Sequence, residues 1–277
     1  MTGSRNQVEV DGLRIAYERA GEGPALILLH GYLGDSRGTW GPQLDELSDE
    51  FTVVAWDAPG VGRSTDPPPE FRLPDYADCL AAFVYALGLQ RPHVAGLSFG
   101  GGLALELYRR HRSLPRTLVL ASAYAGWAGS LPREEVDRRL QQVLELADLP
   151  PDRFVGEVMP TLFSESTPAE TVAEFALNAS GFHPAGLRAM THSIAEADLR
   201  DVLPEIGVPT LLLYGENDVR APRRVADDIH AAIPSSKLVV LPGTGHLVNI
   251  EARERFNAEL RAFLRLRPGE PAASSAG

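Results

Sequence analysis

Short apolar runs separated by amphipathic stretches are the main pattern of this chain. Five runs are typical of strands buried on both faces, and they span residues 25–29, 52–56, 93–97, 117–121 and 210–214. Residues 237–241 form a sixth predicted strand. Helical patterns lie between these runs at residues 40–47, 75–87, 103–108 and 223–233, and another follows the last run at residues 252–266. Buried strands that alternate with helices predict an α/β fold, with a mainly parallel central sheet and helices on both of its faces. In such a sheet, ligands bind at the carboxyl ends of the strands.

Two parts of the chain depart from this alternation. Near its start, residues 8–10 and 13–18 alternate around Asp11-Gly12, which predicts an antiparallel hairpin. Between residues 126 and 198 the strand pattern stops, and amphipathic segments cover 133–147, 152–163, 168–178 and 184–197. Thr167-Pro168-Ala169-Glu170 has the form of a capping box before the third segment.

These changes of pattern predict three regions. Residues 1–125 and 199–267 form the α/β core, and residues 126–198 form a helical cap insertion that acts as a lid. Residues 268–277 consist mainly of Pro, Ala, Ser and Gly, a composition typical of a disordered tail.

One strand runs into a motif that points to catalysis. Gly96-Leu97-Ser98-Phe99-Gly100 has the G-x-S-x-G form of a nucleophile elbow. A serine at this sharp strand-to-helix turn has a strained backbone, so the residues two positions away must be small. The turn lifts the hydroxyl out of the sheet, and the N-terminus of the next helix presents free N–H groups to an anion. The motif predicts Ser98 as a nucleophile, which needs a base and an orienting acid.

His246 is the candidate base, because it stands in a glycine-rich loop after a predicted strand, where burial in a core does not explain it. Asp218 is the candidate acid, since it directly follows another buried strand, and Glu216 is its local rival. The chain order Ser98, Asp218, His246 matches that of α/β-hydrolase triads.

Acyl transfer through a serine also requires N–H donors for the developing oxyanion. Phe99, the residue after the serine, supplies one donor, and Tyr32, in the loop His30-Gly31-Tyr32, supplies the second. The substrate pocket is expected between the elbow and the helical insertion. Its candidate lining residues are apolar: Leu33, Trp127, Met159, Phe163 and Leu247.

The chain resembles the α/β-hydrolase superfamily over nearly all of residues 8–267. The motifs that carry the resemblance are His30-Gly31, Asp57-Ala58-Pro59-Gly60-Val61-Gly62-Arg63-Ser64, Gly96-Leu97-Ser98-Phe99-Gly100-Gly101, Gly215-Glu216-Asn217-Asp218 and Gly245-His246. The resemblance implies an α/β-hydrolase fold in which Ser98 is the nucleophile, Asp218 the acid and His246 the base. The stretch from Gly245 to Glu251 is also similar to enol-lactonases and to cofactor-free haloperoxidases. A serine nucleophile, rather than an aspartate, disfavours haloalkane dehalogenase and most epoxide hydrolase chemistry.

We therefore expect a serine hydrolase of the carboxylesterase or lactonase type, acting through an acyl-enzyme on a small to medium-sized, partly hydrophobic substrate. One alternative is a carbon–carbon bond hydrolase of diketone-like substrates, although the loop at 30–35 lacks the Gly-Pro-Gly pattern of many such enzymes. Another is a catalytically slow ligand-binding protein, because a fold does not determine its function. The sequence shows no dinucleotide fingerprint and no metal-ligand motif, so no cofactor and no metal are expected.

Composition narrows the range of partners. The 277 residues carry a formal net charge of −11, which argues against nucleic acid or an anionic membrane as a partner. Cys79 is the single cysteine, so the chain cannot form an intramolecular disulfide. No secretory leader pattern or bilayer-spanning apolar run is seen, so a cytoplasmic location is the expectation.

Overall fold

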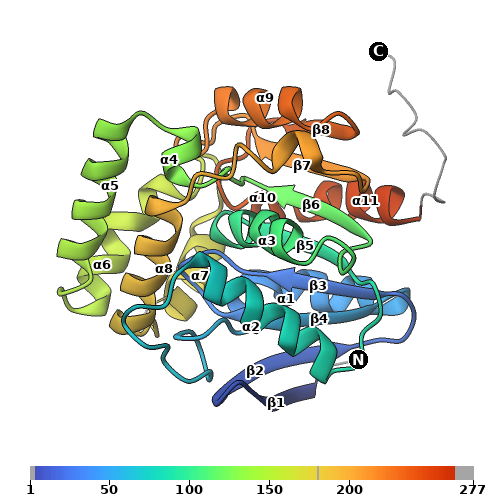
Figure 1. Ribbon diagram of the computed structural model, residues 1–277. Coiled ribbons are helices and arrows are strands. Elements are labelled where there is room, and N and C mark those ends of the chain that lie inside the picture. The colour runs from blue at the N-terminus through green and yellow to red at the C-terminus, as the bar shows by residue number, and fades with distance from the viewer. Residues whose placement is uncertain (1–3, 180, 266–277) are drawn as a thin grey trace.

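The computed structural model describes residues 4–179 and 181–265, and within these residues eight strands form one sheet (Figure 1). The strands are β1 (Ser4–Val10), β2 (Leu13–Ala20), β3 (Ala25–Leu29), β4 (Thr52–Trp56), β5 (His93–Leu97), β6 (Thr117–Ala121), β7 (Thr210–Gly215) and β8 (Ser236–Leu241). Their order is β1-β2-β4-β3-β5-β6-β7-β8, and the strands from β4 to β8 in this order run parallel. The predicted α/β fold with a mainly parallel sheet is confirmed.

The antiparallel edge of the sheet is the predicted hairpin. Asp11 and Gly12 have φ angles of 49° and 80°, the left-handed conformation that a tight two-residue turn requires at both positions. Val10 therefore pairs with Leu13, and β2 in turn pairs antiparallel with β4.

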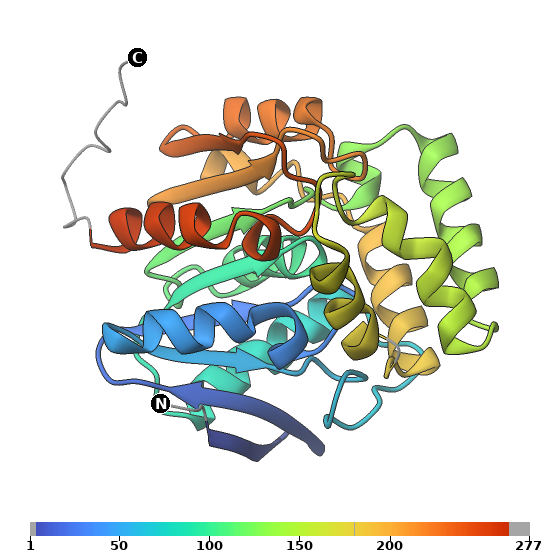
Figure 2. The ribbon, with the colours of Figure 1, turned by 180° about the vertical axis from the view of Figure 1, so that it is seen from behind.

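Helices cover both faces of the sheet. The helices of the α/β part are α1 (Ser36–Glu46), α2 (Leu73–Ala86), α3 (Phe99–Arg110), α9 (Arg223–Ala232), α10 (Val248–Glu251) and α11 (Arg253–Leu264). Short 3₁₀ turns elsewhere in the described chain span Leu47–Asp49, Met159–Thr161 and Leu203–Glu205. Figure 1 shows α2 and α3 in front of the sheet, and Figure 2 shows α1 and α11 on the opposite face.

The predicted start of α1 at residue 40 was wrong by four residues. The helix begins at Ser36, because the Asp35 side chain accepts a hydrogen bond from the Gly38 N–H (2.7 Å) and caps its first turn. The first turns contain Gly38, Gly41 and Pro42, which are poor helix formers. The sequence therefore gives only a weak signal for the start of this helix.

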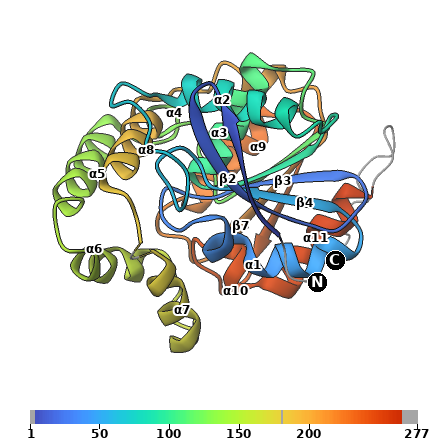
Figure 3. The same ribbon diagram turned by 90° about the horizontal axis from the view of Figure 1, so that it is seen from below.

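Residues 126–198, here called the helical segment, contain α4 (Trp127–Ser130), α5 (Arg133–Leu146), α6 (Pro151–Val158), α7 (Ala169–Ala179) and α8 (Pro184–Glu196). Three of these helices agree with the predicted amphipathic stretches to within a residue, and α6 ends at Val158, five residues before the predicted end at 163. The short α4 was not predicted. The helices lie together beside one end of the sheet (Figure 3). Thr167, the first residue of the predicted capping box, donates its hydroxyl to Glu251 (2.7 Å). The cap itself stays a prediction.

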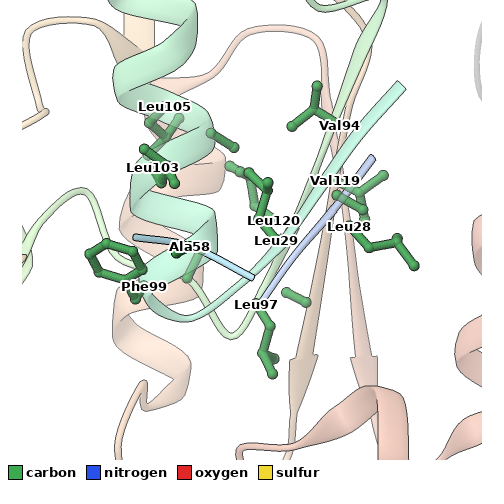
Figure 4. Close-up of a cluster of buried hydrophobic side chains, with 14 of the residues drawn as sticks. Leu28, Leu29, Ala58, Val94, Leu97, Phe99, Leu103, Leu105, Val119 and Leu120 are labelled. Carbon is green, nitrogen blue, oxygen red and sulfur yellow. The ribbon is translucent and has the colours of Figure 1, made fainter. Parts of the chain in front are cut away.

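The core that supports the predicted nucleophile lies between α3 and the central strands. Leu29 of β3, Val94 of β5 and Leu120 of β6 are buried on that side of the sheet, and Leu28 of β3 and Val119 of β6 are buried on its opposite side (Figure 4). Such apolar contact on both sides of a strand holds its end rigidly. None of the described helices is long and apolar enough to cross a membrane. The predicted tail at 268–277 lies outside the described residues.

Candidate active site

Ser98 occupies a strained turn between β5 and α3. Its φ and ψ angles are 53° and −110°, a conformation that L residues rarely adopt. The flanking glycines are required by space. A Cβ on Gly96 would lie 2.1 Å from the Gly100 carbonyl oxygen, and one on Gly100 would lie 2.2 Å from the Leu29 carbonyl oxygen. The turn thus has the geometry that the G-x-S-x-G motif predicts, and it leaves Ser98 7% exposed.

The loop after β3 lies against this turn. A Cβ built on Gly31 would be 3.8 Å from the Ser98 Cβ. Within the described ranges, neither the Tyr32 N–H nor the Phe99 N–H donates a hydrogen bond to protein. Both amides are therefore free to bind an oxyanion, although that role stays a prediction.

His30 holds the same loop in place, a function that the sequence did not reveal. Its Nε2 accepts the Ala58 N–H (3.0 Å), so the ring hydrogen is on Nδ1, which donates to the Gly31 carbonyl oxygen (2.5 Å). Burial lowers the pKa of His30, which keeps the ring neutral and preserves this pair of contacts.

Asp218 and His246 form a buried hydrogen-bonded pair. His246 Nδ1 donates to Asp218 Oδ2 at 2.8 Å, and the two residues are 2% and 4% exposed, respectively. The other carboxylate oxygen, Oδ1, accepts the N–H groups of Arg220 (2.8 Å) and Ala221 (2.9 Å). These donors stabilise the ionised carboxylate and orient it toward the imidazole, which leaves His246 Nε2 as the proton acceptor.

The rival acid, Glu216, has a different contact. It is exposed, and its carboxylate accepts the Gly243 N–H (3.0 Å). The loops of Asp218 and His246 also touch through their backbones, because Asn217 N–H donates to the Thr244 carbonyl oxygen (2.8 Å). This close approach places Asp218, not Glu216, at the imidazole.

Part of the predicted triad is not joined by a hydrogen bond. In the portion of the chain that the structure describes, the Ser98 hydroxyl makes none, so its contact with His246 stays a prediction. Catalytic hydrogen bonds are often long before substrate binds, so this geometry does not weaken the assignment. Within the same portion, no three His, Cys, Asp or Glu side chains are grouped to hold a metal ion.

Arg220 was missed by sequence reasoning. Its Nη1 donates to Thr161 Oγ1 (2.9 Å), its Nη2 donates to the Tyr32 hydroxyl, and its guanidinium carbon lies 5.4 Å from the centroid of the Tyr32 ring. Arg220 thus connects the Asp218 loop, the Tyr32 loop and the helical segment. Its position two residues after Asp218 was the only available signal.

Four of the five predicted pocket residues belong to the hydrophobic core, and the fifth, Phe163, packs against it. Phe163 is half-buried with its ring against Phe175 (5.7 Å between centroids), and the other four are buried: Leu33, Trp127, Met159 and Leu247. Their contact with substrate stays a prediction. A cavity of about 320 Å³ between the core and the helical segment has many polar and charged lining residues, such as Glu18, Arg37 and Arg63. None of the candidate triad residues lines this cavity.

Comparison with known proteins places this site in a family. Residues 24–253 match the model of the alpha/beta hydrolase fold. Serine hydrolase BPHL from Homo sapiens is 30% identical over 266 residues, which cover 93% of this chain and 85% of that protein. A thermophilic esterase from Thermogutta terrifontis has a TM-score of 0.84 at 30% identity, covering 95% of this chain and 98% of the esterase. The enol-lactonase from Burkholderia xenovorans LB400 has a TM-score of 0.79 at 25% identity, covering 94% and 100%, respectively. These similarities support a hydrolase, and the chain belongs to the α/β-hydrolase family.

Proposed function

We propose that this protein is a serine hydrolase that cleaves a carboxylic ester or a lactone through an acyl-enzyme. The observation that carries the proposal is the buried 2.8 Å hydrogen bond between His246 and Asp218, at the sheet edge where the elbow holds Ser98. The similarity to an esterase and to an enol-lactonase supports this substrate class.

The reaction proceeds in two halves. Ser98 Oγ attacks the substrate carbonyl carbon while His246 Nε2 takes its proton, and Asp218 stabilises the imidazolium that forms. The oxyanion binds the N–H groups of Tyr32 and Phe99. As the C–O bond breaks, His246 returns the proton to the leaving alkoxide. A water molecule then gives a proton to His246 Nε2 as its oxygen attacks the acyl carbon. His246 returns this proton to Ser98 Oγ as the acyl C–O bond breaks, which releases the carboxylic acid and restores the enzyme.

The helical segment serves as a cap over this site. Its helices stand at the sheet end where β3, β5, β7 and β8 finish, and its residues 161–167 contact the loops of both Asp218 and His246. Leu33, Trp127, Met159, Phe163 and Leu247 would surround the substrate with apolar side chains, which suits a partly hydrophobic ester or lactone.

Active-site labelling tests the proposal. A fluorophosphonate probe should react with Ser98, and Ser98→Ala should abolish labelling and lower kcat on an activated aryl ester by about 10³-fold or more. Ser122→Ala is the matched control, since Ser122 also has a positive φ (44°) at the end of the neighbouring strand but its buried hydroxyl has no described partner. The proposal fails if Ser98→Ala retains wild-type activity.

A substrate panel separates the chemistries. Aryl esters and lactones should turn over faster than a vinylogous diketone under the same conditions. Preferred cleavage of the diketone would indicate a carbon–carbon bond hydrolase, and probe binding without turnover of any substrate would indicate a ligand-binding protein.

A further inference from the structure

Glu251 joins two segments that are far apart in the sequence. It is the last residue of α10, five positions after His246. Its Oε1 accepts the Gly245 N–H (3.0 Å), while its Oε2 accepts the Ser164 N–H (2.9 Å) and the Thr167 hydroxyl (2.7 Å). One carboxylate therefore connects the residue preceding His246 with the helical segment.

The backbones of the same two segments are also in direct contact. The N–H groups of His246 and Leu247 both donate to the Leu162 carbonyl oxygen, at 2.9 and 3.2 Å. A Cβ on Gly245 would lie 2.7 Å from the Ser164 nitrogen, so a larger residue there would force the segments apart. The His246 N–H is thus hydrogen-bonded to Leu162, and the preceding Gly245 lies directly against Ser164.

The chemistry of these contacts requires a carboxylate. Each of the three groups that point at Glu251 is a donor, and a carboxylate accepts at both oxygens. A glutamine would bring an NH₂ group against one of these donors and would lose at least one hydrogen bond. Hydrogen bonds to an ionised acceptor are also stronger than those to a neutral one.

We propose that Glu251 is a positioning residue for the base: it fixes the Gly245–His246 peptide against residues 162–167 and so holds the imidazole at Asp218. This inference rests on the proposed role of His246. Glu251 acts through His246 and has no contact with the reacting atoms. Any displacement of residues 162–167 from the core therefore also displaces His246, which couples the helical segment to the catalytic base.

Glu251→Gln tests the inference, with Glu254→Gln as the matched control. Glu254 is exposed, and its side chain makes no hydrogen bond or ion pair with any described residue. On an aryl ester, Glu251→Gln should lower kcat by about tenfold or more while KM changes less than about twofold, because a misplaced catalytic group affects the chemical step more than binding. Glu254→Gln should match the wild type.

Proton NMR provides a readout that does not depend on turnover. The His246 Nδ1 proton, hydrogen-bonded to Asp218, should give a far-downfield resonance that is absent from His246→Gln. Glu251→Gln should broaden or shift this resonance, and Glu254→Gln should leave it unchanged. An unchanged resonance together with wild-type kcat in Glu251→Gln would overturn the inference.

Thr167 offers a second test if Glu251→Gln fails to fold. Thr167→Val removes one of the three donors, and Thr167→Ser restores the hydroxyl. We expect a decrease in kcat of about threefold for Val and recovery for Ser; equal kcat for Val, Ser and wild type would contradict the inference. Ser98→Ala, measured alongside, separates the two proposals: if it is inactive while Glu251→Gln is fully active, the proposed function stands and the role of Glu251 does not.

Discussion

At the scale of single residues, Ser98 has a backbone conformation that lowers stability. Its φ of 53° with ψ of −110° is unfavourable for any side chain, because Cβ crowds the neighbouring peptide groups. Such strain costs about 1–3 kcal/mol and is found mainly at functional sites, where the surrounding structure enforces it. Here the packing of α3 against β5 and the flanking glycines enforce the turn.

The Ser98→Gly variant should therefore be more stable than the Ser98→Ala variant. Both substitutions remove the hydroxyl, but only glycine relieves the strain, so we expect Ser98→Gly to unfold with a free energy about 1 kcal/mol higher than Ser98→Ala. Urea denaturation measures the difference. At Gln141, exposed within α5, the order should reverse, with alanine about 1 kcal/mol more stable than glycine. Equal stabilities at position 98 would show that the turn is not strained.

The motif that begins at Asp57 is explained by contacts rather than by catalysis. The buried Asp57 carboxylate accepts the N–H groups of Ser36 (2.9 Å) and Arg63 (3.2 Å). Gly62 is required because its Cβ would lie 2.5 Å from Asp57 Oδ2, and the Ser64 hydroxyl donates to the Asp57 carbonyl oxygen (2.6 Å). These residues order the loop that lies beside the Tyr32 loop.

At the scale of elements, the helical segment contacts the core through two glycines. A Cβ on Gly186, in the first turn of α8, would lie 2.0 Å from the Gly60 carbonyl oxygen in the loop after β4. The backbones of Gly60 and Gly186 are in direct contact at this point. A backbone cannot rotate away from an added Cβ as a flexible side chain would. The position of α8 on the core therefore depends on the absence of a side chain at residue 186.

Two glycine-to-alanine substitutions should have opposite effects. Gly186→Ala should lower the free energy of unfolding by about 2 kcal/mol, because it forces α8 away from the loop. Gly156→Ala should raise it by about 0.5–1 kcal/mol, because Gly156 is exposed within α6 and its added Cβ meets nothing within 4 Å. Thermal or urea denaturation of both variants measures this. Destabilisation by both, to the same extent, would show that the Gly60 contact is not the cause.

Element prediction succeeded where the signal was local. The bounds of β3, β4 and β6 agree with the apolar runs, because a strand buried on both faces needs an apolar residue at each position. It could not reveal contacts between distant parts of the chain. The Thr167 hydroxyl donates to Glu251, 84 positions away, and no local pattern indicates that pair.

At the scale of the whole molecule, buried histidines make stability depend on pH. Burial, with a smaller contribution from the charge of Arg116, lowers the pKa of His93 to about 4, from 6.5. His93 lies at the start of β5, where its Nδ1 is 2.8 Å from the Thr117 hydroxyl. Because the pKa is lower in the folded state, the unfolded chain binds the proton first. The free energy of unfolding that depends on neutral His93 is therefore fully present above about pH 6.5 and is lost as the pH falls through 4.

The His93→Gln variant should therefore lose less stability in acid than the wild type. A fall in pKa from 6.5 to about 4 corresponds to about 3 kcal/mol, so the stability difference between wild type and variant should change by up to that amount between pH 7 and pH 4. Urea denaturation at several pH values measures it. A His93→Gln curve that runs parallel to that of the wild type would contradict the prediction.

The sequence by itself determined the parallel sheet, the helical content of residues 126–198 and the sharp turn at Ser98. Each of these depends on the spacing of apolar and small residues within one stretch of chain, which is local information. Only the tertiary structure decided that Asp218 rather than Glu216 contacts His246, that His30 holds the Tyr32 loop, and that Arg220 and Glu251 bind the helical segment. Hydrogen-bond partners depend on where separate loops meet at the end of the sheet, and that meeting is set by packing of the whole chain.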